Sequence, residues 1–349
     1  MKEDFKISER KHELLISAVE GYIENASPIT SERVQKTLFK NLSSATLRNE
    51  LSALEEMGFL KQLHTSSGRI PTTKAYRYYV NNIIQNNNLD TDVIEEIKDK
   101  FVMRSAFLSD MLTNIAKSIN QITNFPTYVR IKSFEDLTVQ GINIIPLITG
   151  QGLILFQTNA GIINNTIELG ADVTEEICKD ASKYLTTNLY NKKITDIIEN
   201  IEYYNEMFKK QIAFYQELFV AVTGILKQFA EERSSKLISS NTTKLLSEPE
   251  YKDVNEVKKL VKLIENEKEI KEIIENIDDN SSNDVVFTIG DENLNEKYSD
   301  YSIINTNYHI GNGVVASVSV LGPERMDYAK IASALKYISD ELTKYNKEK

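Results

Sequence analysis

The sequence predicts an α+β protein that begins with a winged helix-turn-helix domain, and three observations support this fold class. Residues 8–57 carry three helical patterns, and a short hairpin pattern follows them. Two stretches rich in β-branched side chains, 127–169 and 285–321, are separated by long helical patterns. At 349 residues and 41% hydrophobic side chains, the chain is long enough for two or three domains with their own cores.

The three N-terminal helices each have a residue suited to cap them. Ser8 precedes the first helix, Thr30 or Ser31 precedes a short second helix, and Ser43 or Ser44 precedes the third. Hydroxyl side chains at these positions accept hydrogen bonds from backbone N–H groups of the first helical turn. We therefore expect a compact three-helix unit.

The third helix and the hairpin after it form the most informative stretch of the chain. Leu47, Leu51 and Leu54 recur at the spacing of one buried stripe, so the opposite side of this helix faces outward. Gly58 ends the helix, and Phe59–Leu63 alternates like a strand. The turn that follows, residues 65–69, contains a glycine and a basic residue at its tip. A helix followed by such a hairpin is typical of winged helix-turn-helix proteins, which place the helix in the major groove of double-stranded DNA.

Residue chemistry assigns DNA contacts within this stretch. Near the helix N-terminus, hydroxyls and free N–H groups suit phosphates or bases, an arginine suits guanine, an asparagine suits adenine, and an alanine suits the thymine methyl group. The arginine at the wing tip suits the minor groove or a phosphate, and the remaining basic residues suit phosphates. The nine candidates are Ser44, Ala45, Thr46, Arg48, Asn49, Lys61, Arg69, Lys74 and Arg77. An alternative for Arg48 and Asn49 is an ordinary exposed helix surface that pairs with nearby glutamates.

The charge distribution agrees with this placement. Residues 1–80 contain 12 basic and 10 acidic side chains, whereas the whole chain has a net charge of −10. Residues 40–80 contain 6 basic and 3 acidic side chains. Phosphate contacts supply most non-specific DNA affinity, so a DNA-binding surface needs an excess of positive charge. This stretch is therefore the part of the chain that can face DNA without electrostatic repulsion. Because the excess of basic over acidic side chains is small, an ordinary solvated surface is the alternative to a DNA-binding one.

Several other protein classes are disfavoured. One cysteine, Cys178, permits neither an internal disulfide nor a cysteine-based zinc site, and the three histidines have no metal-ligand spacing. Gly150 and Gly152 lead into a strand and lack a third glycine, so they do not indicate a dinucleotide site. No catalytic motif is present, so no enzyme, cofactor or metal is expected. The absence of a long apolar run or a leader predicts a cytoplasmic protein.

The remaining chain is predicted to alternate between helices and strands. Residues 81–90 are polar and are expected to form a linker. The expected elements after it are a helix over 91–122, strands over 127–169, helices over 172–232, a charged helix over 254–277, strands over 285–321 and a helix over 324–342.

Three segments resemble the HrcA family of bacterial heat-inducible transcription repressors. Residues 43–80 match the family pattern SSATIRNEMADLEELGYL and HTSAGRIPTDKGYRFYV without a gap. Residues 322–328, GPERMDY, resemble GPTRMDY, and residues 245–251, LLSEPEY, resemble LLEQPEF. Departures from the family pattern include Leu47 for isoleucine, Ala75 for glycine, and a different loop at residues 311–313.

The resemblance implies a winged helix-turn-helix domain over 1–80, a GAF-like domain over 91–165 and 251–349, and an inserted, mostly helical dimerising domain over 166–250. It also implies a homodimer that binds an inverted-repeat operator upstream of chaperone genes. The chaperonin would keep this repressor active, and heat stress would release it from DNA.

Two alternatives remain at this point. One is a winged-helix regulator whose GAF-like body binds a small ligand, which would change operator affinity at constant temperature. The other is an enzyme with an appended DNA-binding domain, which would require clustered titratable groups in a deep pocket.

Overall fold

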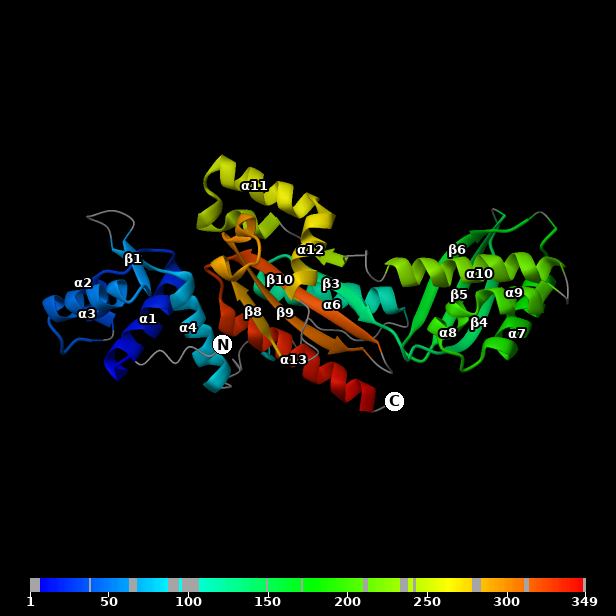
Figure 1. Ribbon diagram of the computed structural model, residues 1–349, viewed down its shortest axis with the longest axis horizontal. Coiled ribbons are helices and arrows are strands. Elements are labelled where there is room, and N and C mark those ends of the chain that lie inside the picture. The colour runs from blue at the N-terminus through cyan, green and yellow to red at the C-terminus, as the bar shows by residue number, and fades with distance from the viewer. Residues whose placement is uncertain are drawn as a thin grey trace.

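The computed structural model places three units in a row (Figure 1). It describes residues 7–37, 39–62, 68–86, 94–95, 107–148, 150–170, 172–209, 213–232, 238–240, 243–277, 284–310 and 314–347. We call residues 7–86 the N-terminal segment, and residues 107–133 together with 238–347 the body; the third unit is inserted between these two parts of the body. Helices and strands both contribute to the core, so the predicted α+β class is confirmed.

The N-terminal segment consists of helices and one small hairpin. Its elements are α1 (Glu9–Asn25), α2 (Ser31–Thr37), α3 (Ser44–Glu56), β1 (Leu60–Gln62), β2 (Arg69–Pro71) and α4 (Thr73–Asn86). The predicted cap of the first helix is confirmed, because the Ser8 side chain accepts a hydrogen bond from the backbone N–H of Lys11. Strands β1 and β2 are antiparallel, with Leu60 opposite Pro71.

A five-stranded antiparallel sheet forms the centre of the body. Its order is β7-β3-β10-β9-β8, with β3 (Thr127–Ser133), β7 (Ile238–Ser240), β8 (Val286–Ile289), β9 (Tyr301–His309) and β10 (Val315–Pro323). Strands β9 and β10 pair along nine residues, from His309 opposite Val315 to Tyr301 opposite Pro323. Both are buried along nearly their whole length, so they form the middle of the core.

Helices cover this sheet. Helix α6 (Leu108–Thr123) and helix α13 (Tyr328–Lys347) pack against it, and the hydroxyl of Tyr308 in β9 donates to the Leu335 carbonyl in α13. Two short 3-10 turns, η1 (Thr243–Ser247) and η2 (Pro249–Tyr251), lead into α11 (Val254–Glu265) and α12 (Glu267–Ile277). Two further turns, η3 (Gly290–Glu292) and η4 (Glu296–Tyr298), connect β8 to β9.

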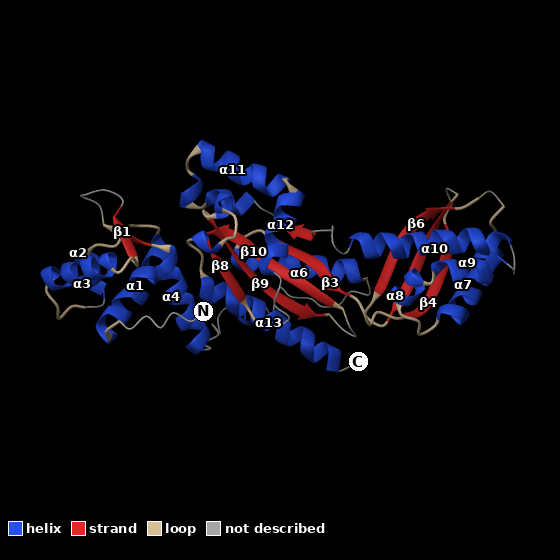
Figure 2. Cartoon of the chain, viewed as in Figure 1, coloured by secondary structure: helices blue, strands red, loops and turns tan. Residues whose placement is uncertain are grey.

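The third unit is inserted between β3 and β7, and Figure 2 shows its strands apart from the central sheet. It contains a three-stranded antiparallel sheet, β4 (Val139–Pro146), β5 (Gln151–Thr158) and β6 (Ile162–Glu168). Helix α7 (Glu175–Leu189) packs against β4, and α10 (Ala213–Glu232) packs with α7 and with the two short helices α8 (Ile194–Glu199) and α9 (Ile201–Lys209).

The structure corrects the expected boundaries of this insertion. It begins near residue 139, not 166, because β4, β5 and β6 pair only with one another among the described strands. It ends with α10, because β7, the next described strand, pairs with β3 of the central sheet. The expected GAF-like part therefore loses residues 139–165.

Other boundaries also differ. The expected linker over 81–90 is helical up to Asn86, where α4 ends, and residues 87–90 lie outside the described residues. The helix expected over 91–122 is described in its second half, where it is α6 (Leu108–Thr123), whereas residues 91–93 and 96–106 lie outside the described residues. Residues 65–67 of the expected turn and the loop at 311–313 also lie outside them. The single charged helix over 254–277 is two helices, broken at Asn266.

Candidate nucleic-acid interface

Helix α3 buries one side and exposes the other, as predicted. Leu47, Leu51 and Leu54 are fully buried, whereas Ala45, Arg48 and Asn49 are exposed. This periodicity places an alanine, a guanidinium group and an amide together on the outer side of one helix. These are the side-chain types that distinguish bases in the major groove.

The start of α3 is fixed by hydroxyl contacts. The Ser43 side chain accepts from the Thr46 backbone N–H at 3.1 Å, and the Ser43 and Thr46 hydroxyls lie 2.9 Å apart. The Ser44 hydroxyl lies 2.9 Å from the hydroxyl of Ser31 in α2. Both Ser44 and Thr46 remain partly exposed, so these bonds position the first turn of α3 against α2 and leave it accessible.

The hairpin is anchored beside α3 through close backbone contacts. Gly58 has φ of +78°, the left-handed conformation that ends a helix with least strain in glycine. Ile29 and Arg69 exchange both backbone hydrogen bonds, at 2.7 and 2.9 Å. A side chain at Gly68 would lie 2.5 Å from the Ile29 carbonyl oxygen. Glycine is therefore required where the hairpin returns.

Arg69 does not occupy the wing tip, which corrects our expectation. It is the first residue of β2, and its side chain, 12% exposed, turns toward α3. Its Nε donates to Glu55 Oε2 at 2.7 Å, and its Nη2 donates to the Ser52 hydroxyl at 2.9 Å. The sequence of the turn identified a basic residue, but it did not indicate that the Glu55 carboxylate on α3 would bind that residue. In this arrangement Arg69 links the hairpin to α3.

The other three basic candidates lie in different surroundings. Lys61 is exposed on β1. Lys74 donates to the Met57 carbonyl at 2.9 Å and lies 4.8 Å above the Phe59 ring centroid, so it caps the end of α3. Lys74 thus has a structural contact that the sequence did not predict.

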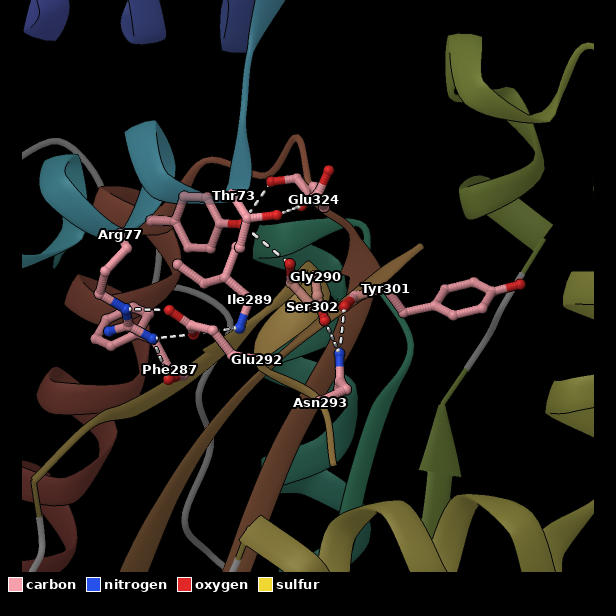
Figure 3. Close-up of polar contacts among 11 residues, drawn as sticks. Thr73, Arg77, Phe287, Ile289, Gly290, Glu292, Asn293, Tyr301, Ser302 and Glu324 are labelled. Carbon is pink, nitrogen blue, oxygen red and sulfur yellow. Dashed lines mark hydrogen bonds and ion pairs between the residues drawn. The ribbon is translucent and has the colours of Figure 1, made fainter. Parts of the chain in front are cut away.

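Arg77 on α4 contacts the body instead of facing solvent. Its Nε donates to Glu292 Oε1 at 2.6 Å, its Nη2 pairs with the other oxygen of the same carboxylate, and Nη2 also donates to the Phe287 carbonyl at 2.6 Å (Figure 3). This bidentate ion pair joins residues 215 positions apart in the chain. It could not be anticipated from local sequence.

A second contact between the N-terminal segment and the body lies one helical turn away. The Thr73 hydroxyl donates to Glu324 Oε1, and Figure 3 shows both beside Gly290. Gly290 has φ of +49°, and a side chain there would overlap the Glu324 carboxylate and approach the Thr73 hydroxyl to 2.8 Å. Burial raises the pKa of Glu324 above its ordinary value, an effect opposed by the Thr73 hydrogen bond and the nearby Lys61 charge.

Arg325 makes the third contact and joins two of the motifs that carry the HrcA resemblance. Its side chain is 9% exposed, and it pairs with Glu250 at 2.6 Å and with Glu248 at 2.5 Å. Its Nη1 also donates to the Ile23 carbonyl, near the C-terminal end of α1, at 2.7 Å. Burial alone would lower the pKa of Arg325, but the hydrogen bonds and charges of Glu250 and Glu248 raise it above its ordinary value. Sequence reasoning singled out both motifs without assigning this role.

Two general properties complete the description. No helix in the described part of the chain is long and apolar enough to cross a membrane. Among those same residues, no group of three or more His, Cys, Asp or Glu side chains is arranged to hold a metal ion.

Comparison with known proteins identifies the family. The family model described as the HrcA protein C-terminal domain matches residues 109–332. A heat-inducible transcription repressor HrcA from Thermoanaerobacter pseudethanolicus is 31% identical over 340 residues, covering 97% of this chain and 96% of the relative. The protein of the same name from Ruminiclostridium cellulolyticum is 29% identical over 338 residues, covering 96% of each.

One solved structure shares the fold. It is described as the crystal structure of a hypothetical protein at 2.2 Å resolution, has a TM-score of 0.73 and 20% identity, and is matched over 98% of this chain and 99% of its own. The family model matches residues 109–332, and the relatives match over nearly the full length of the chain. The chain therefore belongs to the HrcA family of heat-inducible transcription repressors.

Proposed function

We propose that this protein represses chaperone operons by binding an inverted-repeat operator as a homodimer, with α3 in the major groove. The exposed face of α3, with Ala45, Arg48 and Asn49 beside the hairpin, carries this proposal. Three helices followed by a hairpin support a winged helix-turn-helix assignment for residues 7–86. The central antiparallel sheet with flanking helices supports a GAF-like assignment for the body.

The repressor is proposed to leave DNA on heat stress, and the chaperonin is proposed to keep it competent. The contacts between the N-terminal segment and the body support release on heat stress, because they include hydrogen bonds and ion pairs at Thr73, Arg77 and Arg325 beside the Tyr76–Tyr328 ring contact. Interfaces of this kind are polar and permit relative motion of domains. A loss of a few kcal/mol in such an interface is enough to shift a two-state population.

The operator experiment compares two duplexes at physiological salt. One contains an inverted repeat taken from upstream of a chaperone operon, and the other has the same composition in scrambled order. We expect the purified protein to retard the first far more strongly. Equal retardation of both duplexes would contradict operator recognition, and a one-subunit stoichiometry on the repeat would contradict the dimer.

A second candidate, a regulator that responds to a small ligand, is favoured by one cavity. It has a volume of about 120 Å³ and lies where α6 and β3 of the body meet β6 and α10 of the insertion. Its lining is largely apolar and includes Arg130, a residue type that suits a short-chain carboxylate. Titrating a set of such acids into the protein–operator complex at constant temperature tests this candidate. A change in operator affinity without chaperonin would favour it.

A further inference from the structure

We infer that Glu292 competes with DNA phosphates for Arg77, so that docking of the N-terminal segment on the body restrains DNA binding. This inference rests on the proposed function and adds a regulatory contact to it. We call Asp291, Glu292 and Glu324 the acidic edge of the body.

The Arg77–Glu292 pair has the geometry of a phosphate contact. Two nitrogens of one guanidinium group face two oxygens of one carboxylate. A guanidinium group binds two phosphate oxygens in the same bidentate way, so the carboxylate presents an equivalent anion to it. One Arg77 side chain cannot make both contacts at once.

The body holds the Glu292 carboxylate in place for this contact. The Ile289 backbone N–H donates to Glu292 Oε2 at 2.8 Å, which fixes the carboxylate at the end of β8. The Phe287 carbonyl accepts a further hydrogen bond from Arg77 at 2.6 Å. The guanidinium group therefore meets an anion and a carbonyl that are already oriented, and little side-chain entropy is lost on the body side.

The rest of the acidic edge reinforces the effect. Thr73, the first residue of α4, donates to Glu324 and lies 3.5 Å from Asp291 Oδ2. Thr73 and Arg77 are one turn apart, so the acidic edge faces the first two turns of α4, where the helix dipole attracts anions. A DNA backbone that approached this part of α4 would meet three carboxylates.

The contact is also weak enough to exchange. The Arg77 side chain is 26% exposed and the Glu292 side chain is 30% exposed. An ion pair with this much exposure is reached by solvent and screened by salt. DNA, with its high charge density, can therefore displace the carboxylate.

The test measures DNA affinity of the full-length protein by fluorescence anisotropy over a series of salt concentrations. The probes are the inverted-repeat duplex and its scrambled counterpart. Glu292→Gln should raise affinity for both duplexes by about two- to fivefold, the range set by an exposed ion pair. It should also make the dependence of log K on log salt steeper by about one phosphate contact.

Three further variants make the result specific. Glu296→Gln removes the same charge from an exposed residue on η4 and should leave affinity unchanged. Arg77→Lys keeps the positive charge but loses the bidentate pairing with either anion, so Glu292→Gln should change affinity less in this background than in the wild type. Arg77→Ala should lower affinity for DNA, because it removes the phosphate contact. Adding Glu292→Gln to Arg77→Ala should have no further effect, because Glu292 then has no guanidinium group to withhold from DNA. Circular dichroism of each variant confirms that it folds.

The outcomes separate this inference from the proposed function. Tight binding of the inverted repeat by the wild type, with no change in affinity or salt dependence for Glu292→Gln, would overturn the competition and leave the repressor intact. An equal increase for Glu292→Gln in the presence and absence of Arg77 would also overturn it. Failure of the wild type to bind either duplex would overturn both.

Discussion

Two arginines of the N-terminal segment look alike in the sequence but differ in their surroundings. Arg48 is exposed on the outer side of α3, whereas Arg69 is 12% exposed and bonded to Glu55 and Ser52. A guanidinium group on an accessible helix is available to a base, and one held by a carboxylate supports the fold. The two residues should therefore respond differently to substitution.

Replacing Arg48 with alanine should weaken operator binding by about 1 to 3 kcal/mol and relax discrimination at one base pair. The reason is the loss of a bidentate contact to a base edge. Affinity measured against a set of single-base-pair variants of the operator checks this result. A uniform loss across the set would instead make Arg48 a phosphate contact, and an unchanged melting temperature of the free protein serves as the control.

Replacing Arg69 with alanine should lower the free energy of unfolding by about 1 to 3 kcal/mol, because it leaves the Glu55 carboxylate without its charged donor. Urea unfolding followed by circular dichroism measures the change. Lys61→Ala, an exposed basic residue on the partner strand, is the matched control and should have little effect. If Arg69→Ala alters DNA affinity and leaves stability unchanged, the structural role assigned to Arg69 is wrong.

At the scale of elements, α4 is the helix through which the N-terminal segment meets the body. Thr73 and Arg77 on α4 reach Glu324 and Glu292, and Tyr76 lies with its ring centroid 5.8 Å from that of Tyr328. Gly290 allows the closest approach. The contact thus combines aromatic packing with polar groups whose charge responds to pH.

Glu324→Gln should stabilise the protein at pH 7. Burial raises the folded-state pKa of Glu324 above its ordinary value of 4.5, so the ionised side chain is penalised in the folded protein. The favourable contribution of Glu324 is complete below the unfolded-state pKa and is lost as pH rises through the folded-state pKa. Glutamine keeps an oxygen for the Thr73 hydroxyl and carries no charge.

Thermal unfolding at several pH values measures this effect. The Tm of Glu324→Gln should exceed that of the wild type at pH 7, and the difference should shrink as pH falls toward 4.5. Glu296→Gln, at an exposed position, should not alter Tm at either end of the range. A lower Tm at pH 7 would show that the charged hydrogen bond with Thr73 outweighs the cost of burial.

Element types could be predicted from the sequence because they depend on local spacing. The leucine stripe of α3, the glycine after it and the long runs of β-forming residues in β9 and β10 are all local signals. Contacts such as Arg77–Glu292 depend on how distant segments meet, so no local pattern contains them. Local spacing was therefore sufficient to predict the exposed residues of α3 and insufficient to predict the residues at the contact with the body.

At the scale of the whole molecule, the division of strands between two sheets was the largest departure from expectation. Alternation marks a stretch as a strand but does not say which strand it pairs with. Strand β3 pairs with β10 and β7, both far along the chain, while β4 pairs with its immediate neighbour β5. The first residue of the insertion therefore could not be read from the pattern of the strands.

The pairing of β3 with β7 has a practical consequence. The insertion leaves and re-enters the central sheet on adjacent antiparallel strands, with Thr127 opposite Ser240 and Val129 opposite Ile238. Val129 and Ile238 are the paired residues nearest the insertion, and β3 continues to Ser133 in its pairing with β10, so a loop from Ser133 back to Ile238 could replace the whole unit without changing strand register. The inserted unit is thus placed where it could be exchanged, enlarged or removed while the central sheet and the N-terminal segment keep their contacts.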